Sequence, residues 1–109
     1  MSVEKIMKLA EKKNYKKIVP FASSKKAEDR AAAAEGLSGA TDDPSCNAVI
    51  GLLRDPDVSV CIKAAQSLKK MNNKKGIEHL RHTANATNDA ALKAACIDSL
   101  ASLVSHYRE

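Results

Sequence analysis

The chain has 109 residues, enough for one domain, and 44% of them are hydrophobic although Trp is absent and aromatic residues are few. No stretch approaches the roughly 20 apolar residues of a membrane span, and the N-terminus lacks the apolar core of a signal peptide, so we expect a cytoplasmic protein with no membrane contact. The net charge of +5 is concentrated in residues 1–26, which contain eight lysines and two glutamates.

The first helical segment, residues 2–13, is amphipathic and rich in lysine. A second helical segment follows, with Tyr15 and Ile18 on its inward face. Pro20 falls inside this segment, and because proline lacks a backbone N–H, we expect it to shorten or kink the helix.

Three later segments superpose without gaps at a period of 31 to 32 residues: 29–37, 60–68 and 92–100. A period between 20 and 50 residues is typical of a repeat architecture, in which each unit buries its apolar face by stacking on its neighbours. Asp29 occupies the position held by Val60 and Leu92, so we expect the first of these helices to be less buried at its start.

The pattern indicates where the helices of the later units begin. Pro44 follows two aspartates and predicts the start of a helix, and Asp55 is the predicted N-cap of the next helix, with Pro56 at its first position. We expect Thr87 or Asn88 to cap the last helix.

These segments together predict an all-α fold. We expect a right-handed α-solenoid of antiparallel helix pairs, an α–α superhelix, with about seven helices. The whole chain, 1–109, forms one predicted domain with units at about 1–23, 24–54, 55–86 and 87–109.

Two segments resemble the HEAT-repeat family, in particular its short HEAT-like or phycobilisome-lyase-type repeats. Residues 55–68 read DPDVSVCIKAAQSL and residues 28–37 read EDRAAAAEGL, and both follow the family motif D-P-x-V-R-x-x-A-A-x-A-L. The arginine of this motif is matched by Arg30 and Lys93 but is replaced by Cys61. The resemblance implies that the second helix of each pair lines a concave face.

From this resemblance we expect a non-enzymatic scaffold or adaptor that binds another protein through that face, without cofactor or metal. We expect a monomer, and self-association through the end helices remains open. The outward residues of the second helices are the predicted partner-binding residues: Lys16, Lys17, Asn47, Gly51, Arg54, Glu78, His79, His82 and Asn85.

Two other functions remain open. Nucleic acid is an alternative partner, through the basic N-terminal end and a lysine-rich rim formed by residues 12–17 and 69–75. The second alternative is an accessory subunit of an enzyme, like the bilin lyases that share this repeat, with Cys61 as the one plausible thiol contact. We expect Cys61 to be partly exposed, whereas Cys46 and Cys96 occupy core positions.

His79 and His82 have a spacing that can share a metal ion. A third ligand is not evident, so a polar helix face is the favoured interpretation of the pair.

Overall fold

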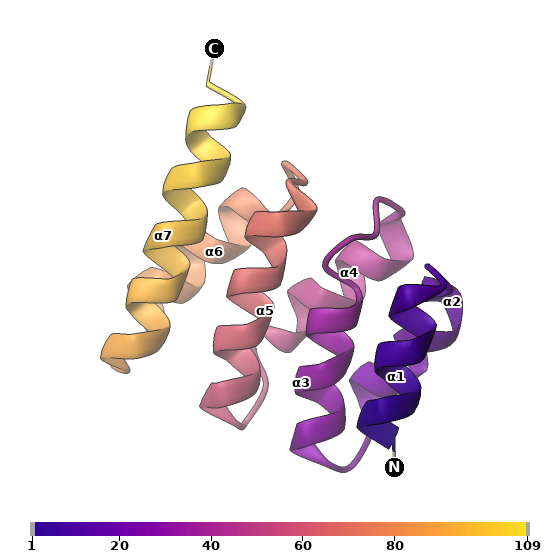
Figure 1. Ribbon diagram of the computed structural model, residues 1–109. Coiled ribbons are helices and arrows are strands. Elements are labelled where there is room, and N and C mark those ends of the chain that lie inside the picture. The colour runs from indigo at the N-terminus through magenta and orange to yellow at the C-terminus, as the bar shows by residue number, and fades with distance from the viewer. Residues whose placement is uncertain (1, 109) are drawn as a thin grey trace.

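The computed structural model describes residues 2–108, which form seven α-helices and one 3₁₀ helix, η1, without any strand (Figure 1). The helices are α1 (Ser2–Glu11), α2 (Tyr15–Ile18), η1 (Val19–Ser23), α3 (Ala27–Gly36), α4 (Asp43–Leu52), α5 (Val58–Met71), α6 (Gly76–Ala86) and α7 (Ala90–His106). The predicted all-α fold with about seven helices is confirmed for this part of the chain. None of the helices described is long and apolar enough to span a membrane.

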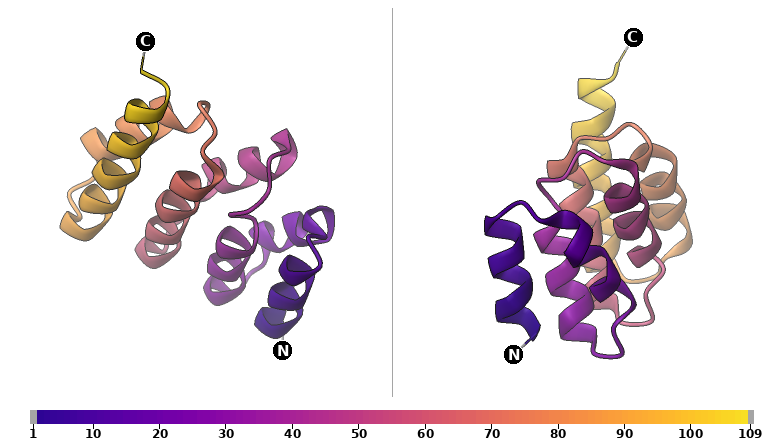
Figure 2. Two further views of the ribbon diagram at one scale, coloured as in Figure 1. Left: turned by 45° about the horizontal axis from the view of Figure 1, so that its top comes forward. Right: turned by 90° about the vertical axis from the view of Figure 1, so that its right-hand side faces the viewer.

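The helices form two layers, which the right-hand view of Figure 2 separates clearly. The first layer consists of α1, α3, α5 and α7, which lie side by side and run in the same direction (Figure 1). The second layer consists of α2 with η1, α4 and α6. Each helix falls within one of the four units expected from the sequence. The right-handed sense of the superhelix and the unit boundaries stay predictions.

Small buried side chains allow the helices of the first layer to pack closely. Ala33, Ala64 and Cys96 occupy equivalent positions in α3, α5 and α7, and each is fully buried. At Gly36 of α3, an added Cβ would lie only 3.2 Å from the Ile6 side chain and 3.3 Å from that of Ile18. The spacing between neighbouring units therefore depends on residues that contribute little volume.

Two buried serines connect the first-layer helices by hydrogen bonds. The Ser67 hydroxyl of α5 donates to the Ala34 carbonyl of α3 at 2.7 Å. One unit later, the Ser99 hydroxyl of α7 donates to the Ala65 carbonyl of α5 at 2.6 Å. Because the two bonds occupy the same repeat position, they fix the same relative placement of successive helices.

An ion pair connects the α3 unit to the loop before α5. The Arg30 guanidinium donates two hydrogen bonds to the Asp55 carboxylate, at 2.6 and 3.0 Å, and one to the Ser24 carbonyl at 2.8 Å. Asp55 is therefore not the N-cap that the sequence predicted. That role belongs to Asp57, whose side chain accepts the Ser59 N–H at 2.9 Å, and α5 begins at Val58.

Other local predictions are also corrected. The last helix is capped by Asp89, which accepts the Leu92 N–H at 2.9 Å, rather than by Thr87 or Asn88. The helix that was expected to be less buried at its start begins at Ala27, and Asp29 in its first turn is buried, with its carboxylate accepting a hydrogen bond from the Ser24 hydroxyl at 2.9 Å. The predicted effect of Pro20 is confirmed, since α2 ends at Ile18 and the chain continues as η1.

Candidate partner-binding face

The outward face of α4 carries three of the predicted binding residues. Asp42 caps this helix by accepting the Ser45 N–H at 3.0 Å. The inward residues of α4 and of the turn after it are buried: Cys46, Val49, Ile50 and Leu53. Asn47, Gly51 and Arg54, spaced at i, i+4 and i+7, are exposed.

The outward face of α6 repeats this arrangement 31 residues later. Leu80 and Ala84 are buried, whereas Glu78, His82 and Asn85 are exposed. His79 differs from the other predicted binding residues because it is only half-exposed. The two outward triplets, one on α4 with its following turn and one on α6, therefore occupy equivalent positions in successive units.

A lysine connects these two helices at the surface. The Lys75 ammonium, at the start of α6, donates to the Asn47 side-chain oxygen at 2.9 Å and lies 3.5 Å from the Asp43 carboxylate. We define the α4/α6 face as the surface formed by Asn47, Gly51, Arg54, Glu78, His82 and Asn85.

Lys16 and Lys17 are exposed on α2. They line a shallow hollow at the N-terminal end together with Lys5, Leu9, Asn14, Pro20 and Phe21. The Lys5 ammonium lies 6.0 Å from the centre of the Phe21 ring. The predicted binding residues thus fall into two groups, a mixed polar surface on α4 and α6 and a basic hollow beside α1 and α2.

Several residues of the α4/α6 face lack an intramolecular partner. Glu78 pairs with Arg81 at 2.7 Å. By contrast, the side chains of Arg54, His82 and Asn85 make no hydrogen bond or ion pair with any residue in the range 2–108. Arg54 is therefore an exposed, uncompensated guanidinium that is able to bind a carboxylate with two hydrogen bonds.

Gly51 contributes an unusual feature to this face. A Cβ built at this position meets no atom within 4 Å, so no neighbour in the described residues excludes a side chain. No glycine in residues 2–108 has a positive φ, so its backbone does not require glycine either. Because glycine within a helix costs roughly 0.5–1 kcal/mol relative to alanine, neither the packing nor the backbone accounts for this residue.

The cysteines are protected rather than reactive. Cys61 is buried, with 4% of its surface exposed, and its thiol donates to the Asp55 carbonyl at 3.0 Å, so the expectation of a partly exposed thiol is wrong. Burial raises the pKa of Cys46 and Cys61, and it raises the pKa of Cys96 to about 11. A raised pKa leaves little thiolate at neutral pH, which weakens the case for a pigment-binding thiol.

Metal ligands and the lysine-rich rim were the remaining candidates. Within residues 2–108 no group of three histidine, cysteine or acidic side chains lies close enough to hold a metal ion.

The positive charge of the second lysine cluster of the rim is partly neutralised, because Lys69 pairs with Asp98 at 3.0 Å and Lys75 with Asp43. The first cluster, in residues 12–17, has no acidic partner within the described range.

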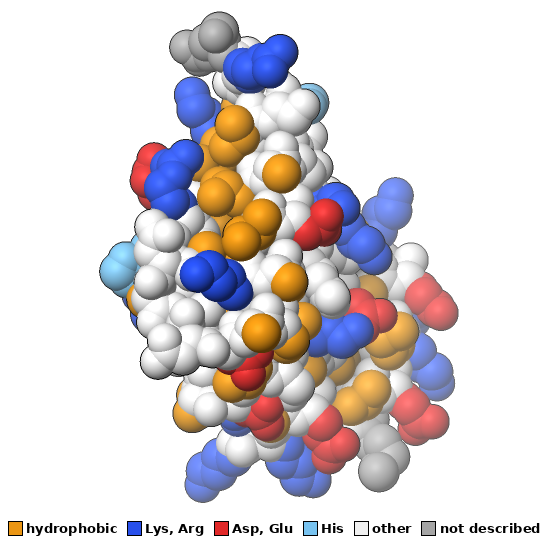
Figure 3. All heavy atoms as spheres, turned by 90° about the vertical axis from the view of Figure 1, so that its left-hand side faces the viewer, with side chains coloured by type: hydrophobic (Ala, Val, Ile, Leu, Met, Phe, Trp, Pro, Cys, Tyr) orange, Lys and Arg blue, Asp and Glu red, His pale blue; other side chains and the backbone are white. Residues whose placement is uncertain are grey.

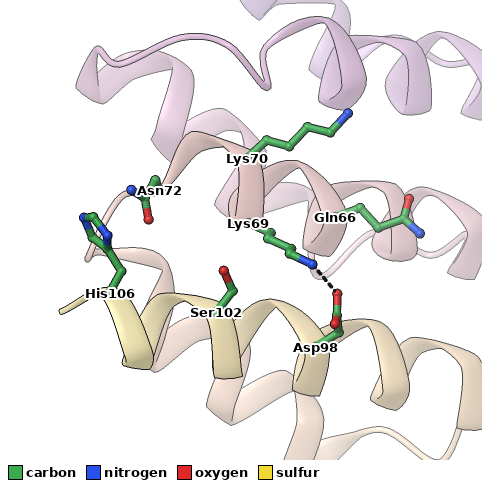
Figure 4. A pocket seen from close by; sticks show the side chains of 7 residues that line it. All are labelled: Gln66, Lys69, Lys70, Asn72, Asp98, Ser102 and His106. Atoms are coloured by element: carbon green, nitrogen blue, oxygen red, sulfur yellow. Dashed lines mark hydrogen bonds and ion pairs between the residues drawn. The ribbon is translucent and has the colours of Figure 1, made fainter. Parts of the chain in front are cut away.

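A polar groove between α5 and α7 was not predicted (Figure 4). Its lining residues are Gln66, Lys69, Lys70, Asn72, Asp98, Ser102 and His106. Lys69 and Asp98 face each other across it and form an ion pair. Ser102 and His106 lie one turn apart on α7, but no hydrogen bond joins these two described side chains. The groove therefore presents polar groups without a paired nucleophile and base.

Sequence reasoning also missed the contacts between units. Ser67 and Ser99 share a repeat position, and this regularity was a usable signal for their hydrogen bonds. Asp55 gave no such signal, because its acid group fits an N-cap equally well.

The comparisons with known proteins agree with the helical stacking. A family model described as HEAT repeats matches residues 15–101, which is most of the chain. No curated protein matches it. HEAT repeats are generally non-enzymatic scaffolds for protein interactions. The coverage of this match and the stacked helix pairs together show that the chain belongs to the HEAT-repeat family.

Proposed function

We propose that this protein is a non-enzymatic adaptor that binds another protein through the α4/α6 face. The family supports a role in protein interaction. The observation that carries the choice of face is Gly51, an exposed helical glycine with open space around it. A glycine that the fold itself does not require is explained if a partner backbone or side chain approaches α4 closely at this point.

The electrostatic character of the face indicates the kind of contact. Arg54 lies one turn after Gly51 and has no intramolecular acceptor in the described residues, so a partner carboxylate is its natural ligand. The surface contains no Phe, Tyr or Trp, and Tyr and Trp are common in the strongest interaction sites. We therefore expect an acidic partner segment bound with modest affinity.

Gly51→Ala is the most specific test of this proposal. Because the added methyl group meets open space, the variant should unfold at the same or a slightly higher urea concentration. Binding to a partner captured by the wild-type protein should nevertheless weaken. Unchanged binding by a stable Gly51→Ala variant would show that nothing approaches α4 closely.

A pair of double variants separates the face from overall charge. Arg54→Glu with His82→Glu changes the charge on the α4/α6 face, and Lys70→Glu with Gln66→Glu makes the same change beside the α5/α7 groove. Only the first double variant should lose capture of the partner, measured by isothermal titration with circular dichroism as the folding control. Equal losses would assign binding to net charge alone.

Nucleic-acid binding at the basic hollow is the second candidate function. Its support is the three lysines, Lys5, Lys16 and Lys17, that line the hollow together with the half-buried Phe21 ring. If it operates, fluorescence anisotropy should detect binding of a single-stranded oligonucleotide that weakens steeply with salt. Lys16→Glu with Lys17→Glu should abolish that signal. Equal anisotropy for this variant and the wild type would remove the hollow as a nucleic-acid site.

A further inference from the structure

The outward face of α7 is an apolar stripe that no other described element covers. Figure 3 looks onto the α7 side of the molecule and shows hydrophobic side chains gathered along this helix. The residues of the stripe are all exposed: Ala90, Ala94, Ile97, Ala101 and Val104. Ile97 and Val104 expose 50% and 38% of their surface, respectively.

The repeat shows what kind of surface this stripe is. Ile97 occupies the position of Ala34 in α3 and Ala65 in α5, and both alanines are fully buried against the following first-layer helix. The carbonyls of these two alanines accept the serine hydroxyls that connect the layer. The outward face of α7 therefore matches a surface that, in α3 and α5, packs against a parallel helix.

The spacing of the stripe suits a symmetric helix pair. Its residues follow one another at intervals of four, three, four and three, which is the a/d pattern of a coiled coil. Lys93 lies at the g position on one side of the stripe and Asp98 at the e position on the other, and both are exposed. In a parallel pair of identical helices, a g residue faces the e residue five positions later in its partner. Lys93 of each copy then meets Asp98 of the other copy, and that carboxylate also pairs with Lys69 of its own chain.

We propose that the stripe on α7 is a homodimer interface, in which α7 packs in parallel against α7 of a second copy of this chain. The alanines at 90, 94 and 101 allow a close approach, Ile97 and Val104 fill the interface, and two Lys93–Asp98 pairs fix the parallel orientation. This favours self-association through an end helix over the monomer expected from the sequence. The proposal does not depend on the α4/α6 face.

Stacking of α7 on the N-terminal helix of a second copy is a poorer fit. The exposed side chains of α1 are mostly charged, and they include Glu4, Lys5, Lys8 and Glu11. Burying these groups against the apolar stripe would remove them from water without partners of opposite charge. The symmetric pairing avoids this desolvation cost.

Sedimentation equilibrium of the 109-residue protein tests the proposal. The wild type should show a concentration-dependent monomer–dimer equilibrium, and Ile97→Lys should be monomeric with an unchanged helical circular dichroism spectrum, because this side chain is half-exposed in the monomer. Met7→Lys is the matched control, since Met7 is an apolar residue on α1 with a similar exposed fraction, 43%. It should leave the dimer intact. A wild type that stays monomeric up to millimolar concentration would overturn the proposal, as would a dimer that survives Ile97→Lys.

Charge exchange and cross-linking test the orientation. In a Lys69→Gln background, which removes the ion pair that Asp98 makes within its own chain, Lys93→Asp and Asp98→Lys should each raise the dimer dissociation constant at least about tenfold, and the double variant should restore it. Val104→Cys should form an intermolecular disulfide under mild oxidation, because identical positions face each other in a parallel pair. A dimer in which Val104→Cys fails to cross-link, or the double exchange fails to restore association, would exclude the parallel arrangement.

Discussion

Three buried serines allow a decisive test of what holds the units together. Ser67 and Ser99 each donate a hydrogen bond to a carbonyl of the preceding first-layer helix. Ser45, in α4, is fully buried, and its hydroxyl makes no hydrogen bond of normal geometry in the described residues, although it lies beside the Asp42 carboxylate, whose pKa is lowered by the Ser45 backbone N–H and, to a smaller extent, by this hydroxyl. The same substitution by alanine should therefore change stability in opposite directions.

The expected magnitudes follow from these contacts. Ser67→Ala leaves the buried Ala34 carbonyl without its donor from α5, and an unsatisfied buried polar group costs about 1–3 kcal/mol. The higher helix propensity of alanine offsets a few tenths of a kcal/mol of this loss, so the variant should still be less stable than the wild type. Ser45→Ala removes a buried hydroxyl that makes no good hydrogen bond. Burying such a hydroxyl costs about 1–3 kcal/mol of stability, so its removal should raise the free energy of unfolding by at most that amount.

Urea unfolding followed by circular dichroism at 222 nm measures both effects. The urea midpoint should fall for Ser67→Ala. It should fall by the same amount or less for Ser99→Ala, which lies on the last helix, α7. For Ser45→Ala it should rise or stay unchanged. A dimer would make the midpoint depend on concentration, so all variants are compared at one protein concentration in the Ile97→Lys background. If Ser45→Ala lost as much stability as Ser67→Ala, the hydrogen bonds between units would not be the cause.

Three further predictions concern packing, pH and the thiols. Ala64→Leu adds volume at a fully buried contact between first-layer helices and should lower the free energy of unfolding by about 1–3 kcal/mol; an unchanged melting midpoint would contradict this packing. Burial raises the pKa of Asp55, but hydrogen bonds from Arg30 and the Asp57 N–H outweigh it and lower the pKa. The stabilisation from Asp55 is thus complete above the ordinary pKa of about 3.9 and is lost as pH falls through the folded-state value. Asp55→Asn should therefore flatten the decrease of the free energy of unfolding at acid pH. An unaltered decrease would refute the assignment. All three cysteines should react with a thiol reagent only as fast as the protein opens, and rapid labelling of any one under native conditions would contradict its burial.

Helix pairing was predictable because it depends on a repeated pattern within each unit. The spacing of Val60, Ala64 and Leu68 places apolar side chains on one helical face, and all three are buried. The same periodicity identified the outward residues of α4 and α6, since the residues opposite a buried face are exposed. Lys16 and Lys17 are also exposed, and they line the hollow next to α1 in the unit where α2 ends before Pro20.

The sequence by itself determined the repeat, the helical class and the buried faces, because these follow from residue spacing along a single helix. Only the tertiary structure decided the partners of Arg30, Ser67 and Ser99, because those partners come from another unit 25 to 34 residues away. Asp55 fits the pattern of a helix cap, but Arg30 of the preceding unit binds its carboxylate instead. A hydrogen bond is directional and short, so a shift of one residue in the stacking of units would change these partners while leaving every apolar face buried.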